Sequence, residues 1–371
     1  MASGKAGAIQ CSSPDVLRIN LECKRAIAHR PLAALRAQTT RPVTMRATQR
    51  ELSMKGKSTD KRVDIVIVNW NAGTQLRDCV DSVIRYGQPL VNHIIVVDNG
   101  STDGSELTVQ DLPNVKLIRA GHNLGFARAS NLGASHADAQ YLLFLNPDAR
   151  LMPGTLDIVC TYMDSNAAEP VGICGIKLVD TEGHTHRHCA RFPTWRTWLW
   201  QALGLSMVLP RYFPSYFMYE FDHETDRQVD HVIGAFFFVR TEVFRRLKGF
   251  DERFFVYFED LDFSLRARQS GWLTQYLANA VAFHKGGGVS EQVKAHRLFY
   301  SLRSRILYAF KHFRRAEAWT VAAVILLIEP FSRLLRAVLR RSPTEARDTL
   351  RGYAMLWRNV PNILRSPDHG Q

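Results

Sequence analysis

The stretch Val63–Trp70, VDIVIVNW, decides the fold class of this 371-residue chain. Its almost unbroken apolar run predicts a strand buried on both faces, as in a parallel sheet with helices on either side. Strands and helices are then predicted in turn: a helix over 74–86, a strand at His93–Asp98, a strand at Val115–Arg119, a helix over 126–137 and a strand at Tyr141–Leu145. Such alternation predicts an α/β fold with a mostly parallel central sheet flanked by helices.

The second half of the chain is predicted to add strands to this sheet and then to become helical. The predicted elements are strands over 171–179, 232–240 and 275–284, a helix over 259–271, and helices beyond 293. Three parts follow: a disordered basic extension over 1–60, one domain over 61–292, and a helical, basic C-terminal region over 293–371.

The positive charge of the chain lies at its two ends. Of the net +13, Lys and Arg outnumber Asp and Glu by 13 to 4 in residues 1–62 and by 15 to 5 in residues 294–371, whereas the middle holds 20 against 26. An acidic core argues against a nucleic-acid-binding protein, and basic ends are compatible with an anionic membrane surface.

The C-terminal region contains one apolar run followed by an amphipathic pattern. Ala318–Ile328 is too short to span a bilayer, and no apolar run reaches 18 residues. Leu334, Leu335, Val338 and Leu339 then alternate with Arg333, Arg336, Arg340 and Arg341. The pattern predicts either a helix on a membrane surface, or a terminal helix packed on the domain with its arginines solvated.

The six cysteines form no CxxC pair, which favours free thiols and a reducing cytoplasm. His184, His186 and His188 alternate beside Cys189, a spacing that would place the three rings on one face of a strand. A zinc site is possible on that spacing. Because no further Cys or His cluster completes it, we prefer a polar strand or a loop on the acceptor side.

Polar residues gather where the predicted strands end, which is the edge at which open α/β sheets bind ligands. Asp98 ends the second strand and could accept hydrogen bonds from a nucleobase or ribose, and Asn69 and Asn71 follow the neighbouring strand. Turn formation and loop capping are the alternatives for all three. Asn123 and Arg128 lie in a glycine-containing turn before a helix, where backbone and dipole favour phosphate.

Two further segments carry candidate metal ligands and a candidate base. Asp148, in Leu145-Asn146-Pro147-Asp148, could hold Mg²⁺ or Mn²⁺, with His284 completing the shell, although Asn-Pro-Asp alone is also a turn. Glu259 and Asp260 follow an aromatic, nearly uncharged run. Apolar walls make a carboxylate more basic, so Asp260 is the candidate general base. Helix-dipole stabilisation is the alternative for these acids.

In combination these segments resemble the family 2 glycosyltransferases of the GT-A fold, which is Rossmann-like, and within them the bacterial rhamnosyltransferase-type members that build cell-surface polysaccharides. The resemblance covers roughly residues 63–310, through VIVNWN, VVDNGSTDGS, HNLGFARASNLG, LFLNPDA, GAFFFVR and GFDERFFVYFEDLDFSLRARQSGW. It implies that Asp98 contacts the base, Asp148 and His284 bind the metal, Asp260 is the base and Glu259 positions the acceptor. Asn146 stands where the family's DxD motif has its first Asp, so metal affinity is expected to be lower.

The resemblance implies an inverting transfer of a sugar, with dTDP-rhamnose favoured as donor and a saccharide or lipid-linked saccharide as acceptor. It also implies that the domain over 61–292 consists of a nucleotide-sugar half at 61–150 and an acceptor half at 151–292. A UDP- or GDP-sugar donor and a non-catalytic membrane-associated scaffold are the alternatives. The implied location is cytoplasmic, at the inner face of the cytoplasmic membrane. The acceptor, linkage and oligomeric state do not follow from the sequence, nor does whether residues 1–53 belong to the protein.

Overall fold

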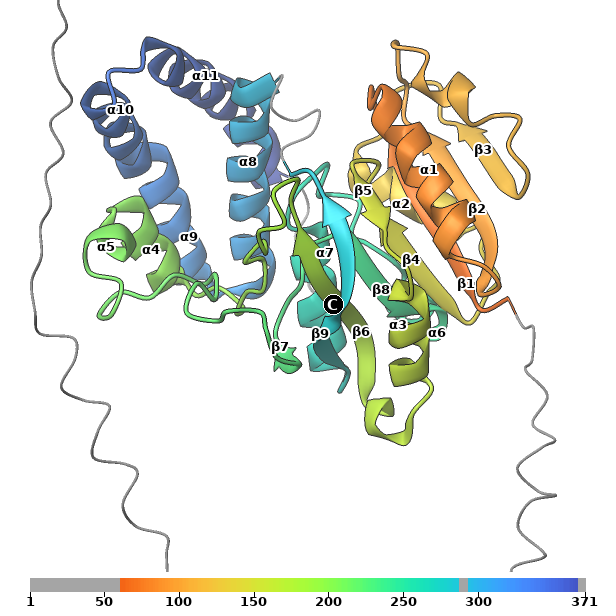
Figure 1. Cartoon of the computed structure of the whole chain (residues 1–371). Helices are drawn as coiled ribbons and strands as arrows, with labels where there is room; N and C mark the ends of the chain where they lie inside the picture. The colour runs from red at the N-terminus through yellow and green to blue at the C-terminus, as the bar shows by residue number, and fades with distance from the viewer. Residues whose placement is uncertain (1–60, 287–292, 366–371) are drawn as a thin grey trace, which may run out of the picture. The chain divides into compact units, whose positions relative to one another are not determined.

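The computed structural model describes residues 61–286 and 293–365 (Figure 1). The predicted extension over 1–60 lies outside these residues. Within them, nine strands form one sheet: β1 (Val63–Asn69), β2 (Val91–Asp98), β3 (Val115–Arg119), β4 (Tyr141–Leu145), β5 (Ala149–Leu151), β6 (Val171–Val179), β7 (Arg227–Val229), β8 (Phe236–Arg240) and β9 (Leu273–His284). Their order is β3-β2-β1-β4-β8-β6-β9-β5, and β7 also pairs with β9.

The strand pairing confirms a mixed sheet with a parallel first half. Strands β1, β2, β3 and β4 pair in parallel, as do β6 and β9. Strand β8 runs antiparallel to both β4 and β6, and β5 and β7 run antiparallel to β9. Each antiparallel pair contains at least one strand of the second half, β5 to β9.

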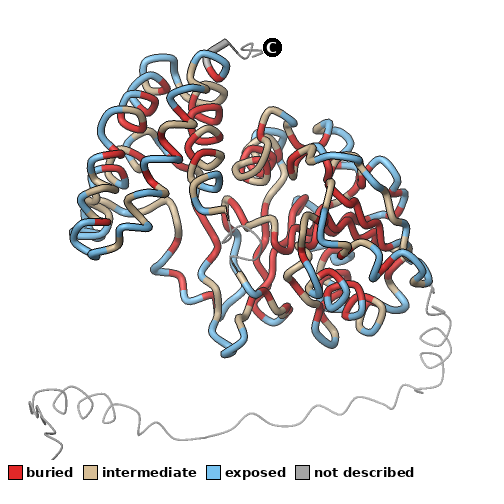
Figure 2. Tube along the Cα trace, turned by 90° about the horizontal axis from the view of Figure 1, so that it is seen from above, coloured by how far each residue is buried: buried red, intermediate tan, exposed pale blue. Residues whose placement is uncertain are grey.

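Helices cover both faces of the sheet. The helices of this part are α1 (Thr74–Tyr86), α2 (Phe126–Ala134), α3 (Thr155–Met163), α4 (Trp195–Ala202), α5 (Leu205–Val208), α6 (Thr241–Arg246) and α7 (Glu259–Gln269), with short 3₁₀ turns at Ser105–Thr108 and Asn166–Ala168. One core packs α1 and α3 on one face, and a second packs α2, α6 and α7 on the other. Buried residues accordingly run along the strands (Figure 2). Ile65 and Ile67 join the first core and Val66 joins the second, which explains the continuous apolar run of β1.

The expected helical C-terminal region is confirmed and has its own core. It comprises α8 (Lys294–His312), α9 (Arg315–Ala323), a π-helical turn (Val324–Ile328), α10 (Glu329–Leu339) and α11 (Pro343–Arg365). The core of this region also includes Trp198 of α4. At its centre, Arg305 of α8 forms a buried bidentate ion pair with Glu329, which also pairs with Arg333. No described helix has the length and apolar character needed to cross a membrane.

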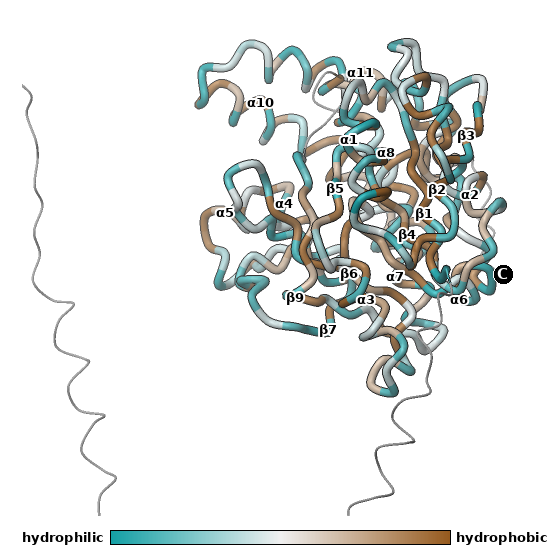
Figure 3. Tube along the Cα trace, turned by 45° about the vertical axis from the view of Figure 1, so that its right-hand side comes forward, coloured by the Kyte–Doolittle hydropathy of each residue, from teal (hydrophilic) through white to brown (hydrophobic). Residues whose placement is uncertain are grey.

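Helix α10 is amphipathic, but its orientation differs from the expectation of a packed helix with solvated arginines. Phe331, Leu335, Val338 and Leu339 are 72%, 61%, 69% and 75% exposed. Arg333 instead pairs with the buried Glu329. The hydropathy colouring shows brown segments along α10 and at α5 (Figure 3). The apolar side of α10 therefore faces outward.

Two local expectations were wrong. The predicted strand over 232–240 begins only at Phe236, because the backbone N–H of Gly234 is donated to the Asp260 side chain. Residues 184–188 form no continuous strand, so the three histidines do not share a face. His184 is exposed, His188 is buried, and His186 lies against His284 with ring centroids 5.6 Å apart.

Candidate active site

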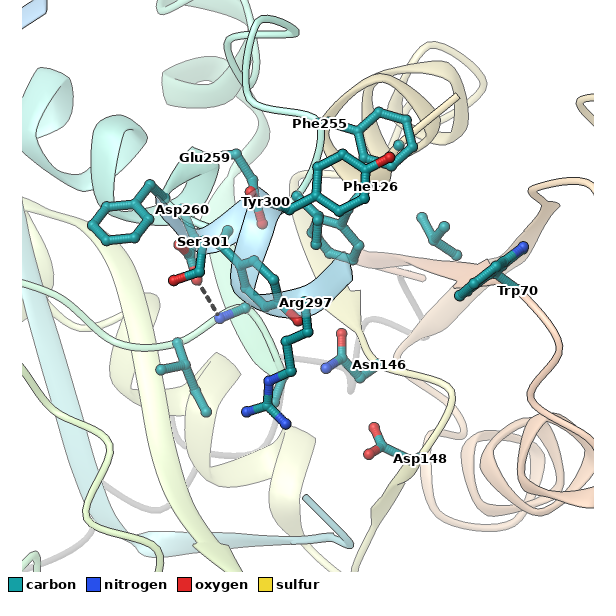
Figure 4. A pocket seen from close by; sticks show the side chains of 18 of the residues that line it. Trp70, Phe126, Asn146, Asp148, Phe255, Glu259, Asp260, Arg297, Tyr300 and Ser301 are labelled. Atoms are coloured by element: carbon teal, nitrogen blue, oxygen red, sulfur yellow. Dashed lines mark hydrogen bonds between the residues drawn. The ribbon is translucent and has the colours of Figure 1, made fainter. Parts of the chain in front are cut away.

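A cavity of about 850 Å³ lies at the carboxyl ends of β1 and β4 and is closed on its far side by α8. Its acidic lining residues are Asp148, Glu259 and Asp260, and Arg297 of α8 extends between the two groups of acids (Figure 4). Six of the site residues predicted from the sequence line the cavity: Asn123, Asn146, Asp148, Glu259, Asp260 and His284. Segments far apart in the sequence thus converge on one cleft.

Asp148 and His284 meet because of strand register. The antiparallel pairing of β5 with β9 places Ala149 opposite His284, and Lys285 N–H donates to the Asp148 carbonyl. His284 Nε2 consequently lies 3.4 Å from Asp148 Oδ1, and both side chains are only slightly exposed. A carboxylate and an imidazole at this separation form a plausible pair of ligands for one divalent cation.

The acids of α7 enter the cavity through an unusual backbone turn. Tyr257 and Phe258, immediately before α7, have φ angles of 69° and 72°, a left-handed conformation that costs on the order of 1–3 kcal/mol for each non-glycine residue. Phe255 in the same segment accepts a hydrogen bond from Phe126 N–H and stacks on Tyr300 of α8 at 4.6 Å. These contacts hold the turn in place despite its local cost.

Asp260 and Glu259 are adjacent but have different environments. Asp260 Oδ2 accepts the Gly234 N–H and Oδ1 accepts the Leu261 N–H, both at 2.8 Å (Figure 4). Burial, and to a lesser extent the charge of Asp260, raises the pKa of Glu259 well above its usual value. The pair therefore places one acid that two backbone N–H groups hold in position beside one buried acid that favours its neutral form.

The third acid of this motif, Asp262, lies in a structural ion-pair cluster. It is fully buried and pairs with Arg266, with His312 at 2.7 Å and with Lys311 at 2.6 Å. The hydrogen bond from His312 and the charges of Arg266 and Lys311 outweigh burial and lower its pKa. Asp262 thereby connects α7 to the end of α8, the helix that closes the cavity.

Asn69, Asn71 and Asp98 are not among the described residues that line the cavity. Asn69 Nδ2 donates to Asp98 Oδ1 at 3.0 Å, and Asn71 Oδ1 accepts the Thr102 N–H. These bonds hold the loops after β1 and β2 together at the cavity edge. Contact of these three residues with a nucleotide remains a prediction.

Of the two residues predicted to contact phosphate, one lines the cavity and the other lies on the protein surface. Asn123 lines the cavity, and its Oδ1 accepts the Gly125 N–H and the side-chain amide of Asn99. Arg128 is exposed and lies 3.8 Å from Glu252. Arg128 is absent from the described lining, so its contact with a ligand also stays a prediction.

Several lining residues escaped sequence reasoning, among them Trp70, His231, Arg297 and Tyr300. Trp70 ends the predicted first strand beside Asn69 and Asn71, so position alone could have identified it. Arg297 and Tyr300 lie on α8, and only tertiary packing brings that helix to the cavity.

Comparison with known proteins identifies the class. Residues 64–248 match the family model "Glycosyl transferase family 2". The N-acetylglucosaminyl-diphospho-decaprenol L-rhamnosyltransferase of Mycobacterium tuberculosis is 28% identical over 300 residues, covering 75% of this chain and 94% of the relative. Rhamnosyltransferase WbbL of Escherichia coli is 28% identical over 201 residues, covering 52% of this chain and 72% of the relative.

Among solved structures, the mannosyltransferase PcManGT of Pyrobaculum calidifontis, in complex with GDP-Man and Mn²⁺, covers 82% of this chain and 87% of its own, with 16% identity and a TM-score of 0.48. The chain belongs to glycosyl transferase family 2 and is a glycosyltransferase. The family match ends before Glu259, Asp260 and His284, whose place in the cavity is given by the structure.

The residues at the Asp148 end of the cavity fit a divalent metal ion. His284 Nδ1 is buried without a hydrogen-bond partner in the described part of the chain, so neither ring nitrogen is committed to a structural role. Ligands of one ion at bond lengths near 2.1 Å stand roughly 3 Å apart in octahedral geometry, close to the observed 3.4 Å. Two three-residue groupings elsewhere among the described residues bring possible ligand atoms together, but hydrogen bonds occupy both. His223 uses both ring nitrogens, and Asp64 accepts the backbone N–H groups of His93, Asp138 and Ala139.

Proposed function

We propose that this glycosyltransferase moves a sugar from a nucleotide-activated donor to a saccharide or lipid-linked saccharide in cell-surface glycan synthesis, with inversion at the anomeric carbon. The observation that carries the proposal is the convergence of Asp148, His284, Glu259 and Asp260 on one cavity. The names of the relatives favour rhamnose as the transferred sugar. The donor that we propose for it is dTDP-rhamnose.

In the proposed reaction Asp260 acts as the general base. Its carboxylate is held by two backbone N–H groups, which position it to take the proton of the acceptor hydroxyl as that oxygen attacks the anomeric carbon. Glu259, held in its neutral form by burial, is suited to hydrogen-bond the acceptor without competing for that proton. Asp148 and His284 would hold Mg²⁺ or Mn²⁺, which neutralises charge on the departing nucleoside diphosphate.

The test is a transfer assay on the full chain with Mg²⁺ or Mn²⁺ and a panel of dTDP-, UDP- and GDP-sugars. Asp260→Asn should lower kcat by roughly 10²–10⁴-fold while donor binding, measured by calorimetry, is retained. Glu252→Gln, an exposed acid outside the cavity, is the control and should leave kcat unchanged. Full activity in Asp260→Asn would overturn the assignment of the base.

The donor arm of the same assay separates the alternatives. Preference for dTDP-rhamnose supports the favoured donor, whereas preference for a UDP- or GDP-sugar assigns another one. Absence of binding to every nucleotide-sugar in the panel would instead favour a non-catalytic scaffold. Analysis of the anomeric configuration of the product by NMR tests inversion.

Because a lipid-linked acceptor would lie in a membrane, we also propose that the protein works at the surface of the cytoplasmic membrane. Helix α10 supports this, because its apolar residues face outward beside the exposed Arg340 and Arg341. Met207, Val208 and Tyr212, in and just after α5, add further apolar side chains that are more than 70% exposed. Apolar side chains beside basic ones are typical of helices that lie in an anionic lipid surface.

Co-sedimentation with vesicles tests the proposed membrane surface. Leu335→Ser with Val338→Ser should weaken binding to phosphatidylglycerol vesicles, and binding to neutral phosphatidylcholine vesicles should be weaker from the start. Leu107→Ser, which changes an exposed leucine near β3, is the matched control. Unchanged sedimentation of the double variant would exclude lipid as the occupant of this face.

A further inference from the structure

His231 lies directly behind the candidate base and has no role in the reaction described so far. It is buried in the connection between β7 and β8, where its backbone N–H and carbonyl pair with Ala190. Its ring faces α7: Nε2 is 3.8 Å from Asp260 Oδ2, and Nδ1 is 3.1 Å from Ser264 Oγ. His231 is also one of the residues that line the cavity.

The hydrogen bonds determine which ring nitrogen carries the proton. Ser264 Oγ donates its single hydrogen to the Asp260 carbonyl at 2.8 Å, so it must accept from His231 Nδ1. In the neutral ring Nε2 is then unprotonated and directs its lone pair toward Asp260 Oδ2. Burial lowers the pKa of His231 and favours this neutral ring, although the charges of Asp260 and Asp230 act in the opposite sense.

Two acceptor atoms therefore face each other with no proton between them. Asp260 Oδ2 already receives the Gly234 N–H, and His231 Nε2 has no hydrogen to offer it. This contact becomes favourable only when a proton reaches Asp260, which is the event that the proposed reaction requires of this carboxyl group. The 3.8 Å separation is longer than a hydrogen bond, as is common for catalytic contacts before substrate binds.

We propose that His231 is a positioning residue for Asp260. Once the Asp260 carboxyl group has taken the proton of the acceptor hydroxyl, it donates a hydrogen bond to Nε2 of His231. This rests on the proposed function. The acceptor O–H bond breaks and its electron pair forms the new glycosidic bond, while the nucleoside diphosphate leaves with the electrons of its bond to the sugar. The proton resides on Asp260 Oδ2 and is shared with His231 Nε2.

The groups around His231 leave it as the nearest proton acceptor for Asp260. On α7, Glu259 favours its neutral form, and Arg268 pairs with Asp230 at 3.3 Å. Burial holds the pKa of His188 at about 3 and raises the pKa of Tyr216, so neither side chain ionises near neutral pH. The remaining carboxylate facing the ring is Asp230, whose Oδ2 accepts the Phe192 N–H.

The experiment measures kcat and KM against pH for wild type, His231→Gln, His231→Phe and Ser264→Ala. We expect kcat to fall by roughly 10- to 100-fold in both His231 variants, with donor and acceptor KM within about twofold of wild type. The acid limb of the kcat profile should move, because the group that shares the proton with Asp260 is gone. His184→Gln, an exposed histidine away from the lining, is the control and should match wild type.

A purely structural histidine predicts another outcome: lower melting temperatures with a kcat profile that superimposes on that of wild type, which would overturn the inference. If neither His231 variant folds, Ser264→Ala decides, because it keeps the ring and removes the partner that sets its tautomer. An unchanged pH profile in Ser264→Ala then overturns the inference. An inactive wild type, or an active Asp260→Asn, would instead contradict the proposed function, so the two failures are distinguishable.

Discussion

Asp148 and His284 face each other at 3.4 Å across the antiparallel pair β5–β9, at the opposite end of the cavity from the acids of α7. The pairing of Ala149 with His284 sets this distance through the backbone. The metal-ligand pair that we propose would need little reorganisation to accept an ion, because strand register holds its two members in place. The separation of the two ends would leave the proposed metal-binding and proton-accepting roles to different parts of the cleft.

Removing one member of this pair should weaken metal binding. We expect His284→Ala to raise the Kd for Mn²⁺ by roughly tenfold or more, since one of two protein ligands is lost. Electron paramagnetic resonance of free Mn²⁺ measures this without any turnover. His184→Ala, which changes an exposed histidine near Asp180 and Glu182, should leave the Kd unchanged. Equal affinity in His284→Ala and wild type would exclude His284 as a ligand.

Glu259→Gln should change the pH dependence of stability. The raised pKa of Glu259 means that, above the ordinary carboxyl range, the native state keeps a proton that the unfolded state releases. This contribution to stability is present at low pH and is lost as pH rises toward the folded pKa, at up to about 1.4 kcal/mol per pH unit. Glutamine does not ionise, so the stability that the variant gains over wild type should grow as pH rises above the ordinary carboxyl range. Urea unfolding at several pH values measures the gain, and a pH-independent difference would contradict it.

Gly125→Ala should be much more destabilising than Gly121→Ala. Both glycines have positive φ angles, 84° and 80°, and Gly125 also has a ψ of 167°, a region that is essentially restricted to glycine. A Cβ on Gly125 would lie 2.4 Å from the Phe255 carbonyl oxygen, whereas a Cβ on Gly121 meets nothing within 4 Å. We expect Gly121→Ala to cost about 1–2 kcal/mol and Gly125→Ala about 1–3 kcal/mol more, by urea unfolding. Equal costs would show that the loop at Phe255 moves freely.

Glu329→Gln should destabilise the C-terminal region, because it leaves Arg305 buried without its anionic partner. Breaking a buried pair on one side costs about 3–5 kcal/mol. Glu345→Gln provides the comparison: its pairs with Arg336 and Arg340 are more exposed and should contribute less than about 1 kcal/mol. Thermal unfolding of both variants measures the difference. A Glu329→Gln protein as stable as Glu345→Gln would show that Arg305 finds another partner.

The first strands of the parallel half could be predicted because β1 and β4 are continuous apolar runs. Helix α1 and strands β3, β4 and β6 fall on the predicted residues. The three-residue strands β5 and β7 were not predicted, because they are too short to show a periodic pattern. The direction of β8 could not be predicted, since side-chain alternation is the same in parallel and antiparallel strands. The first residues of the predicted strand over 232–240 were assigned to it because they are apolar. In the structure the backbone N–H of Gly234 donates a hydrogen bond to Asp260 instead of pairing with a neighbouring strand.

The same division holds for the candidate site. Asp148, Asp260 and His284 could be proposed from strand ends and an aromatic motif, and they do line one cavity. Arg297 and Tyr300 could not, because no local pattern tells which helix closes a cleft. The orientation of α10 could not be predicted either. The sequence pattern shows that the helix has an apolar face and a basic face, but only the pairing of Arg333 with the buried Glu329 shows that Arg333 turns inward.

The left-handed pair Tyr257–Phe258 has a consequence for how this enzyme is expected to tolerate change. Glycine at either position would relax the backbone and widen the range of directions in which the first turn of α7 can point. Glycine would also give the unfolded chain more conformational freedom, which offsets part of the strain that it relieves. The two bulky residues therefore fix the direction of the first turn of α7 at a local cost in stability.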